Sequence, residues 1–401
     1  MSTRPENPSP PASQARAWVE VDPSALRRNL ERVAAVTGAD TGLIPMVKAD
    51  AYGLGAAGVV RALSSSESRP VPPVAAWGVA TVDEGVALRA AGVAEAIHVY
   101  SPLTPDDLRR AVAAGLVPTL SMPHEFDALL QADRPAAFQI EIDTGMGRAG
   151  APRAMWSTWR EKLTRAGVTR RTPLETEAAA PQSHGLSWAG VFTHFHSADE
   201  AEGPGMSQQL AAFHEALALL DPPEDVRVHI ANSAAALRWA GQVPLGAARA
   251  GIFLYGGAPG PDLAPPEPVA HVRARVVRVV DVLPGTSCGY GATYQAQSQE
   301  RWATLAIGYG DGLPRALGNC GSALVHGQRA PIIGRVSMDL TVINISGLDG
   351  VRPGDVATLL GCDGEACISL SEVADLAGTI SYEILTGLGA RLPRVWLDLT
   401  P

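Results

Sequence analysis

The sequence contains little that would place the protein in a membrane or on a nucleic acid. No apolar run reaches the roughly 18 residues that a membrane-spanning helix needs. The 32 lysines and arginines are outnumbered by 41 aspartates and glutamates, giving a net charge of −9, whereas a nucleic-acid-binding domain normally carries a basic excess. Residues 1–16 are polar and rich in proline and serine, which predicts a disordered tail rather than a secretion signal. We therefore expect a cytoplasmic protein that binds neither membranes nor nucleic acids.

Cysteine is also scarce. The four cysteines lack C-x-x-C spacing and have no histidine partners at zinc-finger distances, so we expect neither a metal site nor a disulfide framework. In contrast, 46% of the 401 residues are hydrophobic and only 18% are charged. This balance supports a large core, and the length fits two ordinary domains or a large α/β barrel with a further module.

Lysine is the rarest charged residue. The chain uses arginine at 30 positions and lysine at only two, Lys48 and Lys162. Lys162 lies on the polar side of an expected amphipathic helix, where lysine and arginine are nearly equivalent. Lys48 instead ends an apolar strand-like run and is followed by the glycine-containing segment ADAYGLG. This position indicates a chemical reason for keeping an amine.

Strand-like and helix-like segments alternate through the first two thirds of the chain. Helix starts are marked by Asp22-Pro23, by the capping pair Thr81 and Glu84, and by Thr104-Pro105. The alternation predicts a (β/α)8 TIM barrel over residues 17–262, with 170–184 as a surface insertion. An open doubly wound sheet is the alternative, but eight strand–helix units favour closure. The expected strands are 42–48, 75–81, 96–100, 117–121, 138–143, 188–195, 226–231 and 245–251.

The remaining third of the chain has a different sequence pattern. Residues 259–268 (PGPDLAPPEP) have the composition of a linker. Beyond them, short β-rich runs are separated by glycine, aspartate and proline turns, and one good helix is expected over 371–378, capped by Ser369 and Glu372. We expect residues 263–401 to form a smaller, mostly β C-terminal domain.

The ends of the barrel strands point to a cofactor. Active sites of such barrels lie at the carboxyl ends of the strands. A lysine emerging there is partly desolvated, which lowers its pKa and suits it to form a Schiff base, although an ordinary surface lysine is the alternative. Ser233 follows the seventh strand and Gly251 the eighth, where a phosphate is usually held; plain capping and packing are the alternatives. Together these positions fit pyridoxal 5'-phosphate.

Nine motifs then resemble, in order, those of alanine racemase. The resemblance runs from about residue 18 to the end and implies a pyridoxal-phosphate barrel, a C-terminal β domain and a homodimer whose active sites are completed across the interface. It also implies an isomerase that interconverts L-alanine and D-alanine and supplies D-alanine for the cell wall. The motifs are VKADAYGLG (47–55), IDTGMGRAG (142–150), THFHSADE (193–200), ANSAA (231–235), RAGIFLYG (249–256), GYGATY (289–294), IGYGDG (307–312), GRVSMD (334–339) and GTISYE (378–383).

The resemblance assigns roles to matching residues. Lys48 and Tyr290 from the other subunit would be the two bases on opposite faces of the cofactor, since racemisation removes a proton from one face and returns one to the other. Arg249 would face the pyridine nitrogen, with His229 and His194 beside it. For Tyr290, Arg249, His229 and His194, a purely structural role is the alternative. Phosphate contacts would come from Tyr52, Ser233, Gly251, Ile252 and Tyr382; substrate contacts from Arg148 and Met338; and the entrance and its support from Tyr309, Arg315, Arg335, Asp199, Ile380 and Asp339.

One position departs from the pattern. Many relatives carry a lysine, carbamylated to an anion, seven residues before the arginine of the DTGMGR motif, and here that residue is Glu141. Glutamate provides an anion directly, so we predict a Glu141–Arg148 ion pair that needs no bicarbonate. The same lysine is also absent from broad-specificity relatives. A racemase of other or broader specificity, such as one for serine, therefore remains an alternative, with a fold-sharing decarboxylase and a non-catalytic pyridoxal-phosphate-binding protein as further ones.

Overall fold

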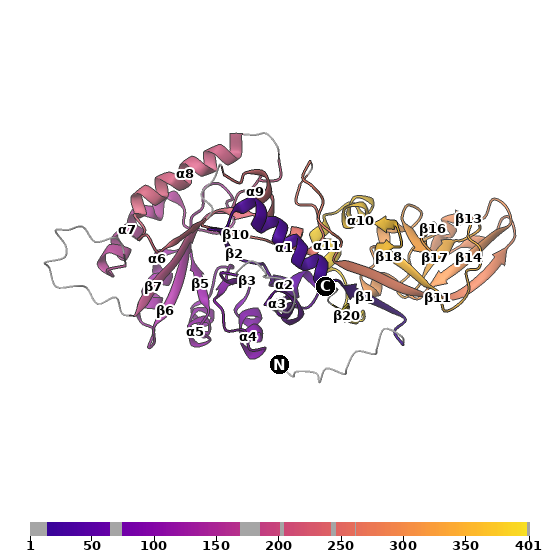
Figure 1. The fold of residues 1–401 in the computed structure, drawn as a ribbon, viewed down its shortest axis with the longest axis horizontal. Helices are drawn as coiled ribbons and strands as arrows, with labels where there is room; N and C mark the ends of the chain where they lie inside the picture. The colour runs from indigo at the N-terminus through magenta and orange to yellow at the C-terminus, as the bar shows by residue number, and fades with distance from the viewer. Residues whose placement is uncertain are drawn as a thin grey trace.

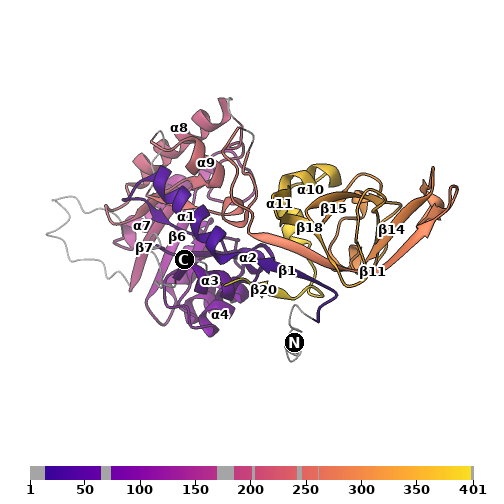
Figure 2. The same cartoon turned by 45° about the vertical axis from the view of Figure 1, so that its right-hand side comes forward.

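The computed structural model describes residues 14–64, 74–168, 185–200, 204–241, 246–260 and 262–398. An α/β barrel forms one end of the molecule and a β-rich domain forms the other, with the long strand β11 (Ala270–Val282) leading from the first into the second (Figures 1 and 2). One continuous core of buried hydrophobic residues runs through both parts. A second, small cluster around Trp302 lies within the β-rich domain.

The barrel is closed, as the alternation of segments predicts. Strands β3 to β8 form a six-stranded parallel sheet, and β2, β10 and β9 form a three-stranded parallel one. Isolated parallel bridges from Leu43 to Val74 and from Met46 to Gly78 join one side, and Gly246 N donates to Val228 O on the other. The barrel strands are β2 (Gly42–Leu43), β3 (Trp77–Val79), β4 (Ile97–Val99), β5 (Val117–Leu120), β6 (Ala136–Glu141), β7 (Leu186–Phe192), β8 (Arg227–His229) with β9 (Ala231–Asn232), and β10 (Ala247–Arg249).

The helices between these strands begin where the sequence predicts. Asp22 caps α1 by accepting from the backbone of Ser24 and Ala25, and Thr81 and Glu84 form a complete capping box on α4. Each cap satisfies N–H groups that have no partner within their own helix. The barrel helices are α1 (Pro23–Thr37), α3 (Ala56–Ser64), α4 (Val82–Ala90), α5 (Pro105–Ala113), α6 (Pro123–Leu130), α7 (Trp156–Arg165), α8 (Pro204–Leu220) and α9 (Ser233–Arg238).

The C-terminal domain is built on a nine-stranded mixed sheet. Its order is β19-β18-β15-β16-β17-β14-β11-β1-β20, with an additional pairing between β18 and β11. Two helices, α10 (Leu370–Ala377) and α11 (Ser381–Thr386), lie beside it (Figure 2). Only α10, capped by Ser369, was expected. The strands are β12 (Ser287–Cys288), β13 (Tyr294–Gln295), β14 (Glu300–Leu305), β15 (Ser322–Val325), β16 (Gln328–Ile333), β17 (Thr341–Asn344), β18 (Val356–Asp363), β19 (Ala366–Ile368) and β20 (Arg394–Trp396), with β1 described next.

The first strand of the chain belongs to this C-terminal sheet. β1 (Ala17–Val21) pairs antiparallel with β11 and parallel with β20, although the expected boundaries grouped residues from 17 onward with the barrel. Just before it, Arg16 pairs with the buried carboxylate of Asp311. The expected tail of 1–16 is therefore wrong at residues 14–16, because a buried charge needs a partner; residues 1–13 lie outside the described ranges.

The structure can be compared with three further expectations from the sequence. A disulfide joins Cys362 and Cys367 across the β18–β19 hairpin, so the expectation of no disulfide is wrong, because the hairpin register brings two cysteines of low sequence separation opposite each other. The expected insertion at 170–184 lies outside the described residues. Within the described ranges, no helix combines the length and the apolar character needed to cross a bilayer.

Candidate active site

Lys48 follows β2 at the carboxyl end of the barrel and begins an unusual turn. The next four residues, Ala49, Asp50, Ala51 and Tyr52, all have φ between 51° and 57°. Non-glycine residues resist this left-handed conformation, at a cost of roughly 1–2 kcal/mol each. Hydrogen bonds at both ends hold the turn, from Ala49 N to Glu84 Oε1 (2.6 Å) and from Ala56 N to Asp50 Oδ1 (2.7 Å). Strain of this kind is typically found at functional sites.

The surroundings of Lys48 favour its neutral amine. Desolvation by the surrounding protein is the largest cause of a lowered pKa, and the positive charges of Arg148 and Arg249 lower it further, while Glu84 opposes them. Only the neutral amine is a nucleophile and a base. The lowered pKa expected from the position of Lys48 at a strand end is therefore confirmed in direction.

A small cradle for an anion lies beside the turn. Gly251 N donates to Ser233 Oγ (2.8 Å), and a Cβ atom placed on Gly251 would lie 2.6 Å from Tyr52 Oη. The ring of Tyr52 lies 4.6 Å from that of Tyr255 and 6.0 Å from that of Tyr382. Burial raises the pKa of Tyr52 and raises that of Tyr382 to about 12. Both phenols thus keep their protons and can donate hydrogen bonds to an anion.

Arg249 ends β10 deep inside the barrel and is only 4% exposed. Its Nη1 donates to His229 Nδ1 (2.8 Å), and its Nη2 donates to Thr193 O (2.8 Å) and lies 3.2 Å from His194 Nδ1. Burial lowers the pKa of His194 to about 3, with Arg249 the next cause, and it lowers that of His229 well below the usual value. Both imidazoles are therefore neutral and serve the guanidinium as acceptors.

Glu141 and Arg148 do not form the predicted ion pair. Glu141 ends β6 and is 5% exposed, with its Cγ close to Gly150, whereas Arg148 is exposed to solvent. No nitrogen of Arg148 lies within 4.0 Å of a Glu141 oxygen, so the direct pair is wrong for this structure. Burial raises the pKa of Glu141, while Arg249 and then Arg148 lower it through longer-range attraction. The Glu141 carboxyl and the Arg148 guanidinium are therefore too far apart for a direct ion pair, but they still interact electrostatically.

A second group of the expected site residues lies elsewhere. Tyr290 is 71% exposed and Met338 is 52% exposed. β13, four residues after Tyr290, lies at the far end of the C-terminal domain from the barrel (Figure 1). Two backbone bonds, from Tyr309 N to Ser337 O (3.0 Å) and from Gly310 N to Met338 O (2.8 Å), hold the segment of Tyr309 beside that of Met338. The structure of one chain therefore does not bring Tyr290 to Lys48.

Asp339 and the remaining entrance residues are also on the surface. Asp339 pairs with Arg391 (2.7 Å), which in turn contacts the buried carboxylate of Asp311 (3.0 Å). Ile380, just before α11, is largely exposed. The other residues expected at the entrance, Asp199, Arg315 and Arg335, are likewise exposed.

Two residues of the site were missed by sequence reasoning. Glu84 was recognised only as a helix cap, although its Oε1 also anchors the turn after Lys48. Gln209, buried on α8, donates to Thr144 Oγ1 (3.2 Å) and to His194 O (3.1 Å), and it accepts from His196 N. It thus ties the loop of the DTGMGR motif to the loop of the THFHSADE motif. No sequence signal separates Gln209 from other polar residues of an amphipathic helix.

Comparison with known proteins identifies the family. Residues 21–259 match the N-terminal domain of alanine racemase and residues 269–396 match its C-terminal domain. Curated alanine racemases from Syntrophobacter fumaroxidans and from Geobacter sp. strain M21 are 35% and 36% identical, and each alignment covers 94% of this chain and 96% or 98% of the relative. The chain belongs to the alanine racemase family. It is an isomerase that depends on pyridoxal phosphate and interconverts the enantiomers of alanine.

Solved structures agree with this membership. The alanine racemase from E. faecalis superposes with a TM-score of 0.84 at 30% identity, covering 96% of this chain and 98% of that one. The Bacillus anthracis enzyme with bound L-Ala-P superposes with a TM-score of 0.80 at 33% identity, covering 96% and 95%. The expected barrel with a mostly β C-terminal domain is therefore the fold of the alanine racemase family.

The residues present fit the cofactor of an alanine racemase. A phosphate group suits the space that a Cβ on Gly251 would fill. It also suits the protonated phenols of Tyr52 and Tyr382 and the hydroxyl of Ser233. An amine with a lowered pKa suits the aldehyde. Arg249, which can only donate hydrogen bonds, suits an unprotonated ring nitrogen.

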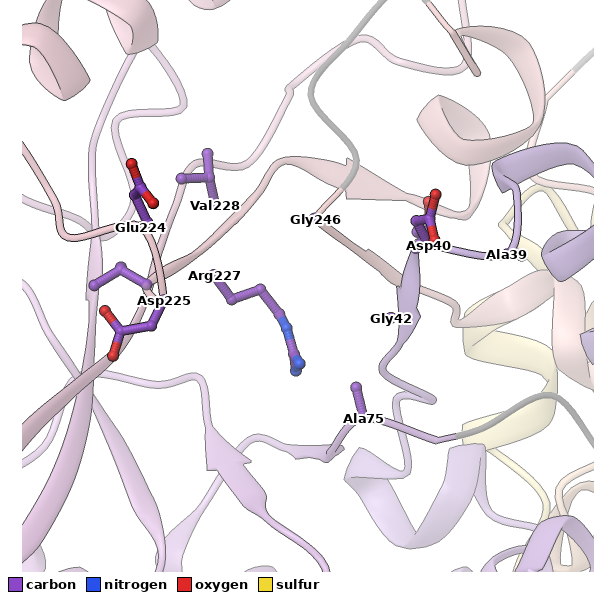
Figure 3. Close-up of a pocket in the computed structure, with 11 residues that line it drawn as sticks. Ala39, Asp40, Gly42, Ala75, Glu224, Asp225, Arg227, Val228 and Gly246 are labelled. Atoms are coloured by element: carbon purple, nitrogen blue, oxygen red, sulfur yellow. The ribbon is translucent and has the colours of Figure 1, made fainter.

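A separate cavity lies at the opposite mouth of the barrel. It has a volume of about 590 Å³ and is lined at the amino ends of the strands by residues that include Gly42, Ala75 and Gly246. The side chain of Arg227 projects into it (Figure 3). Active sites of these barrels lie at the other end of the strands, and Lys48 does so here. This cavity is therefore distinct from the racemase site.

Proposed function

We propose that this alanine racemase works by a two-base mechanism in which Lys48 and Tyr290 of the partner subunit act on opposite faces of the substrate. The observation that carries the proposal is the separation within one chain. Tyr290 is 71% exposed, and β13, which begins four residues after it, lies at the end of the C-terminal domain away from the barrel (Figure 1). A second base opposite Lys48 must then come from another copy, and a two-fold symmetric dimer lets each chain supply what the other lacks.

The proposed chemistry divides between the two bases. Lys48 would hold pyridoxal phosphate in the resting enzyme, and the group would supply a conjugated ring that withdraws electrons from the substrate Cα once the substrate amine has taken the place of Lys48. The neutral amine of Lys48 accepts or returns the Cα proton on one face, and Tyr290 of the partner subunit does so on the other. Two fixed groups invert the centre without turning the substrate.

The remaining residues hold the cofactor and tune it. In this proposal the phosphate is bound by Tyr52, Ser233, Gly251, Ile252 and Tyr382. Arg249 donates to the ring nitrogen and, because arginine keeps its proton, leaves that nitrogen unprotonated. Electron withdrawal by the ring is then weaker than with an acidic partner, which limits side reactions. His229 and His194 keep Arg249 in place.

Substrate binding is proposed to use both subunits. Arg148 and the backbone of Met338 hold the substrate carboxylate, and Tyr309 and Tyr382 narrow the pocket for a small side chain such as that of alanine. Glu141 supplies the negative charge that orients Arg148, and a water molecule fills the gap between them. Asp339 supports the entrance from the C-terminal domain through Arg391. We place this homodimer in the cytoplasm, where it supplies D-alanine to cell-wall synthesis.

Deuterium exchange tests the mechanism directly. Purified enzyme in deuterated solvent should wash deuterium into both L-alanine and D-alanine. The Tyr290→Phe variant should lose exchange of one enantiomer far more than of the other, because the Lys48 face remains intact. Equal loss for both enantiomers would contradict the two-base assignment. The same assay over a panel that includes L- and D-serine ranks the substrates.

A further inference from the structure

Asp311 is a buried carboxylate that the proposed mechanism does not use. It is 1% exposed, and it ends the short 3-10 turn Tyr309–Asp311. Its Oδ2 accepts from Gly308 N (2.9 Å), so the side chain closes the turn that carries Tyr309. A buried charge is costly unless cations and hydrogen-bond donors surround it. The partners of Asp311 therefore show what holds this turn in place.

Two arginines from distant parts of the chain meet at this carboxylate. Arg16, just before β1, places its Nη2 3.0 Å from Asp311 Oδ2, and Arg391, after α11, places its Nε 3.0 Å from Oδ1. Both arginines also reach Asp339. Arg391 Nη2 donates to its Oδ1 (2.7 Å), and Arg16 Nη2 donates to its carbonyl oxygen (2.9 Å). These four residues, which we call the Asp311 cluster, combine two cations with two anions.

The Asp311 cluster joins two segments that carry expected substrate contacts. Asp311 belongs to the turn of Tyr309, and Asp339 directly follows Met338. Each arginine therefore bridges the same two segments with its side chain. The backbones are also in contact, because Gly310 N donates to Met338 O (2.8 Å) and a Cβ atom on Gly310 would lie only 3.0 Å from that oxygen. The cluster thus fixes the spacing between the two segments.

The Met338 segment also lies against the turn of Tyr290. A Cβ atom on Gly334, in the Met338 segment, would lie 2.8 Å from the carbonyl oxygen of Cys288 and 3.1 Å from its Sγ. Cys288 comes two residues before Tyr290. The segments of Tyr290, Met338 and Tyr309 are therefore neighbours in that order. A partner site that is completed by the first of them is within reach of the other two.

We propose that Arg16 is a positioning residue for the substrate site of the partner subunit, acting through Asp311. This role rests on the proposed function, in which the Tyr309 and Met338 segments complete a site around Lys48 of the other chain. Without the Arg16 guanidinium, the buried carboxylate keeps one cation and the two segments keep one of their two side-chain bridges. Their spacing is then less well fixed, so substrate binding weakens while Lys48 and its cofactor are untouched.

Subunit mixing tests where Arg16 acts. One chain carries Lys48→Ala and the other Tyr290→Phe, and heterodimers are purified with two affinity tags. Their single complete site takes Lys48 from the second chain and its C-terminal-domain residues from the first. Arg16→Met in the Lys48→Ala chain should raise the KM for alanine by roughly twofold to fivefold with a smaller change in kcat, as expected for one ion pair that solvent partly screens. Arg16→Met in the Tyr290→Phe chain should change neither constant.

Two variants serve as controls. Arg28→Met in the Lys48→Ala chain should leave the KM unchanged, because Arg28 forms an ion pair of similar exposure with Glu267 (2.7 Å) in the segment between the two domains. Arg16→Lys should give a KM nearer to the wild type than Arg16→Met does, since Arg16 uses one nitrogen for both acceptors and an ammonium also carries several donors. Homodimeric Arg16→Met should bind pyridoxal phosphate with the Kd of the wild type.

Every result of the mixing experiment decides. An equal KM for the two placements of Arg16→Met, or a rise confined to the Tyr290→Phe chain, overturns the role of Arg16. A rise with Arg28→Met as large as that with Arg16→Met overturns it too, because general destabilisation would then account for both. If Arg16→Met does not fold, Asp311→Asn in the same two placements decides by the same comparison. Inactive heterodimers without any further substitution contradict the shared site of the proposed function, and the role of Arg16 with it.

Discussion

The guanidinium of Arg249 donates a 2.8 Å hydrogen bond to Nδ1 of His229, so a permanently charged group and a neutral imidazole share the barrel core. Burial penalises this charge and lowers the pKa of Arg249, with Tyr100 and Glu141 opposing the shift. Backbone carbonyls of Thr193, His229 and Ile230 accept from the same two Nη atoms, and none of these bonds uses the Nε–H group. A cation fixed by this many acceptors can donate to a ligand nitrogen but cannot give up its proton.

Lys48 should be the residue that carries the cofactor. Borohydride reduction of the holoenzyme followed by peptide mapping should place the added mass on the peptide containing Lys48. Lys48→Arg should lower kcat by roughly a hundredfold or more, because arginine is neither a nucleophile nor a base at neutral pH.

The chain offers one matched control for this experiment. Lys162 pairs with Asp127 on the barrel exterior, so Lys162→Arg should keep both cofactor and activity. Added mass on the Lys162 peptide would contradict the assignment of Lys48.

Gly251→Ala should weaken cofactor binding. The new methyl group would lie 2.6 Å from Tyr52 Oη, so the phenol must move out of the cradle. Overpacking of this kind costs about 1–3 kcal/mol, and the Kd for pyridoxal phosphate should rise roughly tenfold. Gly347→Ala is the control, since nothing lies within 4 Å of a Cβ there. Equal Kd values for the two variants would remove Gly251 from the phosphate site.

Three histidines of the barrel, of which His98 and His229 are buried, should make the protein less stable at acid pH. Burial lowers the pKa of His98 to about 4 and that of His194 to about 3, and it lowers that of His229 well below its usual value. In the unfolded chain each binds a proton near pH 6.5, so below this pH the unfolded state holds more protons. The free energy of unfolding should therefore fall by about 1.4 kcal/mol per pH unit for each histidine.

Urea denaturation at several pH values between about 6 and 5 measures this slope. His98→Gln removes one of the three contributions, so its slope should be shallower by about 1.4 kcal/mol per pH unit. A slope identical to that of the wild type would show that His98 titrates equally in the folded and unfolded states.

Glu141 should act as an anion without bicarbonate. Glu141→Gln removes the charge that attracts Arg148, so the KM for alanine should rise by roughly threefold to tenfold with a smaller change in kcat. Added bicarbonate should leave the wild type and Glu141→Gln unchanged. In Glu141→Lys, bicarbonate should raise activity, because the new amine can be carbamylated. Stimulation of the wild type by bicarbonate would contradict the assignment.

Most of the fold was predictable from local patterns. Alternating strands and capped helices predicted the barrel, and the caps at Asp22, Thr81 and Thr104 are present. The place of β1 was not predictable, because its partners β11 and β20 are about 250 and 375 residues away and the strand carries no signal for either. The Cys362–Cys367 disulfide likewise depends on the register of one hairpin.

The site was predictable where chemistry restricts the residue type. A rare lysine at a strand end and a glycine beside a serine were found from sequence, and the structure brings Lys48, Ser233 and Gly251 to one end of the barrel. The left-handed turn after Lys48 was not predicted, because alanine, aspartate and tyrosine all disfavour positive φ. The Glu141–Arg148 pair failed because spacing along the chain does not set side-chain direction.

Subunit complementation tests the central claim most directly. Lys48→Ala and Tyr290→Phe homodimers should each have little activity, since every site lacks one base. Mixing the two chains under exchange should create heterodimers with one complete site, built from Lys48 of one chain and Tyr290 of the other. The expected recovery after statistical mixing is about a quarter of wild-type activity per total protein. Activity that stays at the sum of the separate variants would contradict a site shared between subunits.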